Sequence, residues 1–231
     1  MENNLRQNEI LKYLETRRFA SISELAEVVF RSEATVRRDI QKLSDKGLVK
    51  IVYGGVVKPE YSKSPVPVDL RERENSEEKE RIAKKASELI RDNQTIILDA
   101  SSTVRRICKY IKGYKNLTVI TNNLRVCEEL KNTSVKVFST GGLLLPRREC
   151  FVGHFAEEFI SGVKADMLFF SSQGLSENGD ITDSSEEEIA IRKAMIASSK
   201  KQYFLCDSRK INADYPFKLC NKEDITDILK N

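Results

Sequence analysis

The stretch SEATVRRDIQKL, residues 32–43, combines apolar residues at helical spacing with two adjacent arginines, Arg37 and Arg38. At about 100° per residue, the apolar positions fall on one face of a helix; they are Val36, Ile40 and Leu43. The two arginines then straddle the opposite, exposed side. Taken alone, two exposed arginines on a helix indicate only solubility, so the flanking sequence decides what this helix does.

Two shorter helical patterns precede this stretch. Residues 4–17 carry an apolar stripe at helical spacing. The segment SISELAEVVF follows, and it begins with the capping-box spacing Ser21-x-x-Glu24. Ser32 is a suitable N-cap for the third helix, and Gly47 is a suitable stop. The segment therefore predicts three short helices in succession.

A hairpin pattern comes directly after the third helix. In GLVKIVYGGVVKP, residues 47–59, we predict strands over 49–52 and 56–58, joined through Gly54 and Gly55. Three helices followed by a hairpin indicate a winged helix-turn-helix, in which the exposed side of the second helix of the motif enters the DNA major groove. The planar fork of arginine suits both guanine and phosphate oxygens. The predicted DNA-binding residues are Ser32, Ala34, Thr35, Arg37, Arg38, Gln41, Lys42, Lys50, Tyr53, Gly54 and Gly55.

The small module resembles the N-terminal winged helix of the DeoR family of bacterial transcriptional regulators. The resemblance is carried by the run TVRRDI, residues 35–40, and by the Gly-Gly pair of the hairpin. Tyr53 stands where the family usually has a histidine. The resemblance implies that the chain binds double-stranded operator DNA.

Composition does not decide the partner, because the excess of positive charge is too small to indicate a polyanion by itself. The chain has 231 residues, enough for two domains, and 39 Lys+Arg against 35 Asp+Glu give a net charge of +4. We find neither a signal peptide nor an apolar stretch long enough to cross a bilayer, so we expect a cytoplasmic bacterial protein without a membrane partner. The five cysteines are scattered and there is one histidine, so we expect free thiols and no structural metal.

A proline-containing segment divides the chain. Pro59, Pro65 and Pro67 remove amide donors and favour extended backbone. We predict a DNA-binding domain over residues 1–58, a linker over 59–75 and an effector-sensing domain over 76–231. The mixed-charge run after the prolines, RERENSEEKERIAKKASELI, is interpreted as a helix with a solvated charged face.

The large module alternates apolar strands with helices. Strands are predicted at residues 95–98, 117–121 and 135–139, and in the segments ADMLFFSSQG and QYFLCDSRK. This alternation indicates an α/β domain with a mainly parallel sheet. Glu186, Glu187 and Glu188 are interpreted as the acidic first turn of a helix.

Small polar residues follow each predicted strand. In a parallel sheet the carboxyl ends of the strands share one edge, where ligands collect. Hydroxyls and free amides there suit an anion such as phosphate, to which Lys210 would add a mobile charge. The predicted effector-binding residues are Asp99, Ser101, Ser102, Thr103, Thr121, Asn122, Asn123, Thr140, Gly141, Gly142, Gln173, Gly174 and Lys210.

These loops resemble the C-terminal effector domain of the same family, which is similar in fold to ribose-5-phosphate isomerase. Ser101 stands where glycine is usual, and Arg209 where serine is usual. The resemblance implies a repressor of sugar or carbohydrate metabolism genes that responds to a phosphorylated sugar, needs no cofactor and acts as a homo-oligomer, a dimer or tetramer.

The alternative from another class is a sugar-phosphate isomerase with an accessory DNA-binding module. Isomerisation needs a carboxylate base beside the abstracted proton. The strand ADMLFFSS is followed by Gln173 and Gly174 rather than by acids, and His154 suits a helix start or the surface better than catalysis. The sequence therefore favours a regulator with no catalytic residues.

Overall fold

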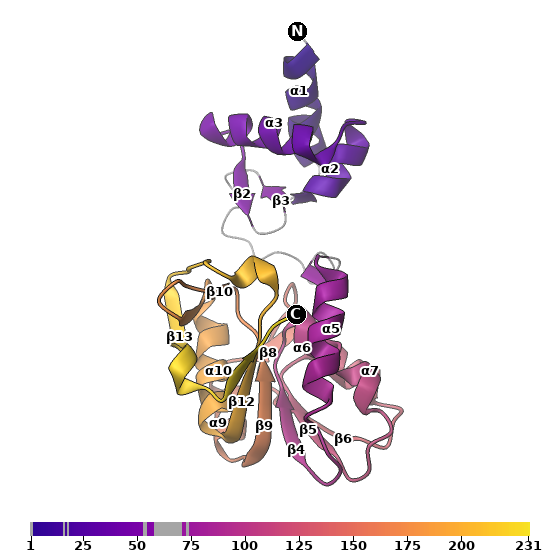
Figure 1. The fold of residues 1–231 in the computed structure, drawn as a ribbon, viewed down its shortest axis with the longest axis vertical. Helices are drawn as coiled ribbons and strands as arrows, with labels where there is room; N and C mark the ends of the chain where they lie inside the picture. The colour runs from indigo at the N-terminus through magenta and orange to yellow at the C-terminus, as the bar shows by residue number, and fades with distance from the viewer. Residues whose placement is uncertain (1, 16, 18, 53–54, 58–70, 73) are drawn as a thin grey trace. The chain divides into compact units, whose positions relative to one another are not determined.

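The structure, a computed structural model, describes residues 2–15, 17, 19–52, 55–57, 71–72 and 74–231. The chain forms two compact units, Met1–Glu74 and Asn75–Asn231. Figure 1 shows the helices and strands of both units. Each unit has a hydrophobic core of its own. Most of the predicted linker, residues 59–70, lies outside the described residues, so the proposed domain boundaries stay a prediction.

The N-terminal unit is a winged helix-turn-helix, as predicted. Its helices are α1 (Glu2–Glu15), α2 (Ile22–Val28) and α3 (Glu33–Asp45). The sheet has the order β1-β3-β2, formed by β1 (Ala20–Ser21), β2 (Lys50–Val52) and β3 (Gly55–Val57). The two-residue strand β1 was not predicted; it pairs antiparallel with β3 and ties the start of α2 to the hairpin.

The predicted caps hold the small helices in place. Ser21 forms a capping box with Glu24, and the side chain of Ser32 accepts a hydrogen bond from the amide of Thr35. The helices enclose a core of apolar side chains; its fully buried members include Ile10, Leu14, Leu25, Val36, Ile40 and Leu43. The apolar face predicted for the third helix is therefore the face that packs.

The C-terminal unit is built on a six-stranded sheet with the order β14-β12-β9-β4-β5-β6. All neighbouring strands pair in parallel. The strands are β4 (Thr95–Leu98), β5 (Thr118–Thr121), β6 (Lys136–Ser139), β9 (Ala165–Phe170), β12 (Ser199–Leu205) and β14 (Asp227–Leu229). The predicted α/β fold with a mainly parallel sheet is confirmed.

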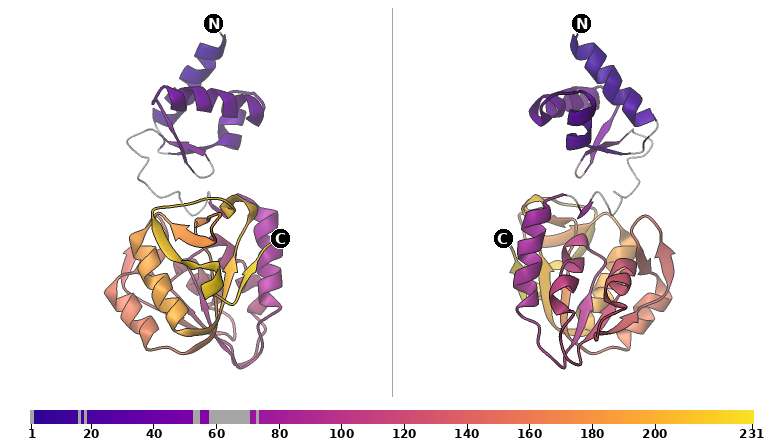
Figure 2. Two further views of the ribbon diagram at one scale, coloured as in Figure 1. Left: turned by 60° about the vertical axis from the view of Figure 1, so that its left-hand side comes forward. Right: turned by 90° about the vertical axis from the view of Figure 1, so that its right-hand side faces the viewer.

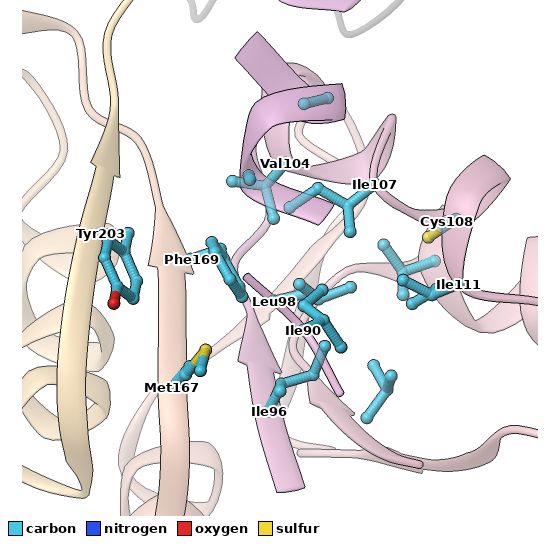
Figure 3. Close-up of a cluster of buried hydrophobic side chains, with 14 of the residues drawn as sticks. Ile90, Ile96, Leu98, Val104, Ile107, Cys108, Ile111, Met167, Phe169 and Tyr203 are labelled. Atoms are coloured by element: carbon cyan, nitrogen blue, oxygen red, sulfur yellow. The ribbon is translucent and has the colours of Figure 1, made fainter. Parts of the chain in front are cut away.

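Helices cover both faces of this sheet (Figure 2). One face packs against α5 (Ser76–Ser87), α6 (Ser102–Arg105), α7 (Cys108–Ile111) and α8 (Leu124–Leu130). The other packs against α9 (His154–Ser161) and α10 (Glu186–Ala197). Successive strand residues point to opposite faces. Phe169 and Tyr203 stack within the first core (Figure 3), whereas Phe170 and Phe204 lie in the second.

Two smaller sheets flank the parallel one and were not predicted. The hairpin β7 (Leu143–Leu145) and β8 (Cys150–Val152) precedes α9. A three-stranded antiparallel sheet has the order β10-β11-β13, from β10 (Gly174–Leu175), β11 (Asp180–Asp183) and β13 (Phe217–Asn221). The 3-10 helices η2 (Ser208–Lys210) and η3 (Lys222–Asp224) complete the unit.

Candidate functional site

The exposed face of α3 carries the residues predicted to contact DNA. Ala34, Arg37, Arg38, Gln41 and Lys42 are exposed, and Ser32 and Thr35 lie at the start of the helix, exposed and half-buried. The opposite face packs through Val36, Ile40 and Leu43. The second helix of the helix-turn-helix thus presents Arg37, Arg38 and Lys42 to solvent on the side opposite its packed face.

The polar side chains on this surface differ in how they are held. Arg37 forms an exposed ion pair with Glu33 one turn earlier, at 3.3 Å, and Gln41 donates to Asp45 at 2.9 Å. Among the residues that the structure describes, Arg38 has no hydrogen-bond or ion-pair partner in the protein. Arg38 is therefore the α3 arginine whose guanidinium is available to a base or a phosphate.

Asp39, which follows these arginines, was not predicted to have a role. Its carboxylate is 2% exposed and accepts hydrogen bonds from Arg6 and Gln7 on α1. Burial raises the pKa of Asp39, but the hydrogen bonds from Arg6 and Gln7 outweigh it, so the pKa lies below its usual range. Asp39 fixes α3 on α1. Its spacing of three and four residues from Val36 and Leu43 was the available sequence signal.

The wing residues divide into three groups. Lys50 is exposed on β2, as a phosphate contact requires. Tyr53 and Gly54 lie outside the described residues. Gly55 is buried in β3, not in the turn between the strands, and a Cβ built there would lie 2.1 Å from the carbonyl oxygen of Ala20. Gly55 therefore packs closely against β1, and its predicted DNA contact stays a prediction.

In the C-terminal unit the predicted effector loops meet at one edge. Because the six strands are parallel, Asp99, Asn122, Thr140, Ser171 and Asp207 all stand at or just beyond the carboxyl ends of their strands. Asp99 accepts a hydrogen bond from the amide of Ser171 at 3.2 Å, which joins the loops after β4 and β9. The convergence expected from the sequence is present.

Several predicted ligand residues are engaged in holding these loops. Thr121 is fully buried, donates to the carbonyl of Leu98 at 2.7 Å and accepts from the amide of Asn123 at 3.0 Å. The amide oxygen of Asn123 caps α8. Gly142 has a φ of +100° and Gly174 starts β10, and a Cβ at either would collide with backbone. These residues hold the loops of this edge in place, and their predicted contacts with a ligand stay a prediction.

Ser101 caps the helix that follows β4. This helix starts at Ser102, and the hydroxyl of Ser101 accepts a hydrogen bond from the amide of Val104 at 3.2 Å. The φ of Ser101, −87°, is ordinary for a residue with a side chain, so this position does not require glycine. The helix, α6, is four residues long. Any anion bound here is therefore held by side chains and amides, with little help from a helix dipole.

A buried arginine that the sequence did not predict organises the centre of this edge. Arg192 on α10 is 4% exposed and contacts three carboxylates, those of Asp99, Asp183 and Glu188, at 3.0, 2.8 and 2.5 Å. Glu188 also pairs with Arg148. Glu188 belongs to the acidic first turn of α10, as predicted, and it is buried between two guanidinium groups.

Protonation states in this cluster follow from the same contacts. Burial raises the pKa of Asp183, but the charge of Arg192 outweighs it, so the carboxyl stays ionised. Burial likewise lowers the pKa of Arg192, and the Asp183 and Asp99 charges more than restore it. The predicted effector residue Asp99 is thus one arm of an internal ion-pair network.

Lys210 is fixed rather than mobile. Its ammonium donates to the carbonyl of Ser172 at 2.7 Å and lies 3.7 Å from Asp207, with 12% of the side chain exposed. Asn122 is only partly hydrogen-bonded. Its amide nitrogen donates to the carbonyl of Phe151, but its buried amide oxygen has no hydrogen-bond partner among the described residues. The remaining predicted ligand residues at this edge are Ser102, Thr103, Thr140, Gly141 and Gln173.

Other kinds of site find no support in the described part of the chain. No group of three or more His, Cys, Asp or Glu side chains there is arranged to hold a metal ion. His154 lies at the start of α9 with 83% of its side chain exposed. Within the same residues, no helix combines the length and apolar character needed to cross a membrane.

Comparison with known proteins gives a consistent result for both units. Residues 6–61 match the DeoR-like helix-turn-helix domain, and residues 74–231 match the DeoR C terminal sensor domain. The HTH-type transcriptional regulator GolR of Listeria innocua is 33% identical over 221 residues, covering 95% of this chain and 87% of the relative.

Two further relatives extend over nearly the whole chain. The L-fucose operon activator of Haemophilus influenzae is 32% identical over 229 residues, covering 99% of this chain and 92% of the relative. The lactose phosphotransferase system repressor of Staphylococcus epidermidis is 31% identical over 228 residues, covering 97% and 90%. Among solved structures, ribose 5-phosphate isomerase A of Methanocaldococcus jannaschii has a TM-score of 0.45 and 13% identity, covering 59% of this chain and 55% of that one.

Proposed function

This chain belongs to the DeoR family of DNA-binding transcriptional regulators, and from that premise we propose that it is a repressor of carbohydrate-metabolism genes released by a phosphorylated sugar. The family consists of regulators, so the isomerase alternative is set aside. The proposal rests on the presence of two features in one chain: an exposed basic face on α3, and a sheet edge lined by polar residues in the sensor unit.

The DNA-binding half of the proposal rests on α3. Its arginines lie opposite the packed face, so they are free to enter a major groove without disturbing the core. Arg38 reads a base or holds a phosphate, and Lys50 contacts the backbone from the wing. A single winged helix offers few contacts, and we infer that the protein acts as a dimer or tetramer reading half-sites about one helical turn apart.

The sensor half rests on the polar edge of the parallel sheet. The hydroxyls of Ser102 and Thr103 and the charge of Lys210 suit a phosphate, and the unpaired oxygen of Asn122 suits a sugar hydroxyl. The named relatives act in fucose and lactose systems, which supports a sugar as the remainder of the ligand. The protein requires no cofactor for this role and works in the cytoplasm, where its DNA and effector are found.

Matched pairs of ligands test the proposal. Glucose 6-phosphate, fructose 6-phosphate and galactose 6-phosphate are compared with the three unphosphorylated sugars by thermal shift and calorimetry. At least one phosphate ester is expected to stabilise the protein by about 2.7 kcal/mol at a hundredfold excess over Kd, and its parent sugar is expected not to. Equal binding of a sugar and its phosphate contradicts the assignment of a phosphate site.

The oligomeric state and the DNA partner have their own test. Light scattering is expected to give a mass of at least two chains, with and without operator DNA. A genomic fragment library selected on the protein supplies the operator, and the ester that binds is expected to release it. A strict monomer on its operator contradicts the proposed assembly.

A further inference from the structure

The helix α9 exposes two aromatic side chains next to the residues through which it packs. Ala156 and Ile160 are fully buried against the parallel sheet. Phe155 and Phe159, one position earlier in each turn, are 75% and 38% exposed. Residues four apart on a helix are neighbours on its surface. Both rings therefore lie together on one flank of α9.

Two more exposed apolar side chains project from the same side of the sheet. Phe138 belongs to β6, the strand at the edge of the sheet (Figure 1), and is in register with Ile120, which lies in the core beneath α9. Leu143 on β7 pairs with Val152, which lies in that core as well. Residues directly opposite each other on neighbouring strands share a face. Phe138 and Leu143, 40% and 66% exposed, thus lie on the side of α9.

These four side chains, which we call the apolar face, have the size of an interface. With roughly 200 Å² for a whole side chain of this kind, their exposed fractions amount to on the order of 400 Å². A stable pair of proteins takes about 800 Å² from each partner, of which somewhat more than half is apolar. The apolar face therefore supplies most of the apolar area that one subunit contributes to a stable dimer.

The charges around the apolar face are of both signs. The ammonium of Lys136 lies 5.3 Å from the centre of the Phe138 ring, on the same side of β6. Glu158 on α9 is exposed and stands between the two phenylalanines in the sequence. A strongly charged partner calls for one sign only, whereas two copies related by a two-fold axis set the lysine of each against the glutamate of the other. The charge pattern favours a second copy of this chain as the partner.

We propose that the apolar face joins two copies of this chain, with the α9 sides of their sensor units packed across a two-fold axis. This inference rests on the proposed function, which needs two DNA-binding units, and it names the surface that brings them together. Aromatic side chains that become fully buried at the centre of an interface carry most of its binding energy. One such surface accounts for a dimer, and a tetramer uses a second surface in addition.

Three variants test this surface. Phe155→Glu and Leu143→Lys each place a charge on the apolar face, and Phe217→Glu changes an exposed aromatic residue of β13, outside it, as the matched control. Sedimentation over a range of concentrations measures the dissociation constant of the pair. It is expected to rise about 100-fold in both variants of the apolar face, because the new charge is buried without a partner, and to stay within about twofold in Phe217→Glu.

The same variants report on DNA binding from a distance. Operator affinity of Phe155→Glu is expected to fall at least about tenfold, although the residue lies in the sensor unit, because a single chain reads only one half-site. Operator affinity of Phe217→Glu is expected to match that of wild type. Circular dichroism checks that both variants keep the wild-type secondary structure.

Hydrogen exchange on the wild-type protein tests the surface even if the variants do not fold. Backbone amides of β6 and α9 are expected to exchange more slowly when the protein is concentrated and paired than when dilution separates it, and those of β13 equally at both concentrations. If wild type stays a single chain at every concentration and on its operator, the proposed assembly itself fails. If wild type pairs, and either a folded Phe155→Glu pairs as tightly or β6 and α9 exchange equally at both concentrations, another surface joins the chains and this inference is overturned.

Discussion

Arginines on two helices of this protein have opposite surroundings. On α3, Arg38 is exposed and has no partner among the described residues of the chain. On α10, Arg192 is buried between three carboxylates. As sequence the two segments are alike, VRRDI and IRKAM, each with a basic pair in a helix. The fold decides whether such an arginine is exposed to an external partner or pairs with carboxylates inside the protein.

The comparison separates two kinds of energy. An exposed arginine adds little to folding, because solvent screens its charge, so its removal is felt in binding. Removal of a buried arginine that neutralises carboxylates lowers the free energy of unfolding, because those charges are left without a partner. The two helices therefore predict opposite phenotypes for the loss of the same side chain.

The largest effect is expected at Arg192. Arg192→Leu leaves Asp99 and Asp183 buried without their guanidinium, and we expect the free energy of unfolding of the sensor unit to fall by about 3–5 kcal/mol. Urea denaturation measures this loss. The neighbouring Lys193 is exposed, so Lys193→Leu is the matched control and is expected to stay within about 0.5 kcal/mol of wild type. Equal stability of the two variants would contradict a structural role for the network.

The DNA-binding unit also contains a buried charged residue, Asp39, which is held by hydrogen bonds from α1. Asp39→Asn keeps the shape and removes the charge that Arg6 and Gln7 bind, at a cost of about 1.5–3 kcal/mol at neutral pH. The folded pKa of Asp39 is lowered, so its stabilisation is present above the unfolded value of about 3.9 and is lost as pH falls through the folded pKa. Hydrogen exchange of the α3 amides, measured at pH 7 and below pH 3, reports the difference in stability between wild type and Asp39→Asn. A gap between variant and wild type that persists in acid would exclude this ionisation as its source.

Arg38→Ala tests the exposed type. We expect a loss of about 1–3 kcal/mol in operator affinity, a factor of roughly 5 to 150, with no change in unfolding. Gel shifts against the selected operator measure the affinity. Lys12 on α1 is also exposed and lies off the α3 face, so Lys12→Ala controls for general loss of positive charge. A wild-type affinity for Arg38→Ala would show that α3 docks through another surface.

The same contrast explains what the sequence predicted. The winged helix and five of the six strands of the parallel sheet could be predicted, because apolar spacing and caps are local signals; the edge strand β14 was missed. Val36, Ile40 and Leu43 pack as their spacing predicts. The Arg192 network was not readable, because its partner Asp99 lies 93 residues away in the sequence. Lys79 was assigned to a solvated face, although it stands three residues before Ile82 on the buried side of α5.

The meeting of the polar loops at one edge was predicted, whereas the hydrogen bonds within these loops were not. Polar residues after parallel strands meet at one edge by topology, which needs no knowledge of side-chain partners. Which of them face a ligand depends on capping and packing within the loops. Thr121 and Asn123 are occupied by hydrogen bonds to the loops themselves, and only coordinates reveal that.

The smallest effect is expected at Ser101, where the family usually has glycine. Two accounts would make this residue important: its bulk could crowd the anion loop, or its hydroxyl could contact the ligand. The hydroxyl caps α6 instead, and the backbone conformation does not require glycine. Ser101→Gly should therefore cost only a few tenths of a kcal/mol of stability and Ser101→Ala about 1 kcal/mol, because glycine is tolerated as an N-cap and alanine is not.

Calorimetry with the sugar phosphate that binds wild type distinguishes the three accounts of Ser101: crowding of the loop, contact with the ligand, and capping of α6 alone. Tighter binding by Ser101→Gly would support crowding, equal weakening by both variants would support a ligand contact, and affinities within about twofold of wild type are expected from a cap that acts only on its own helix.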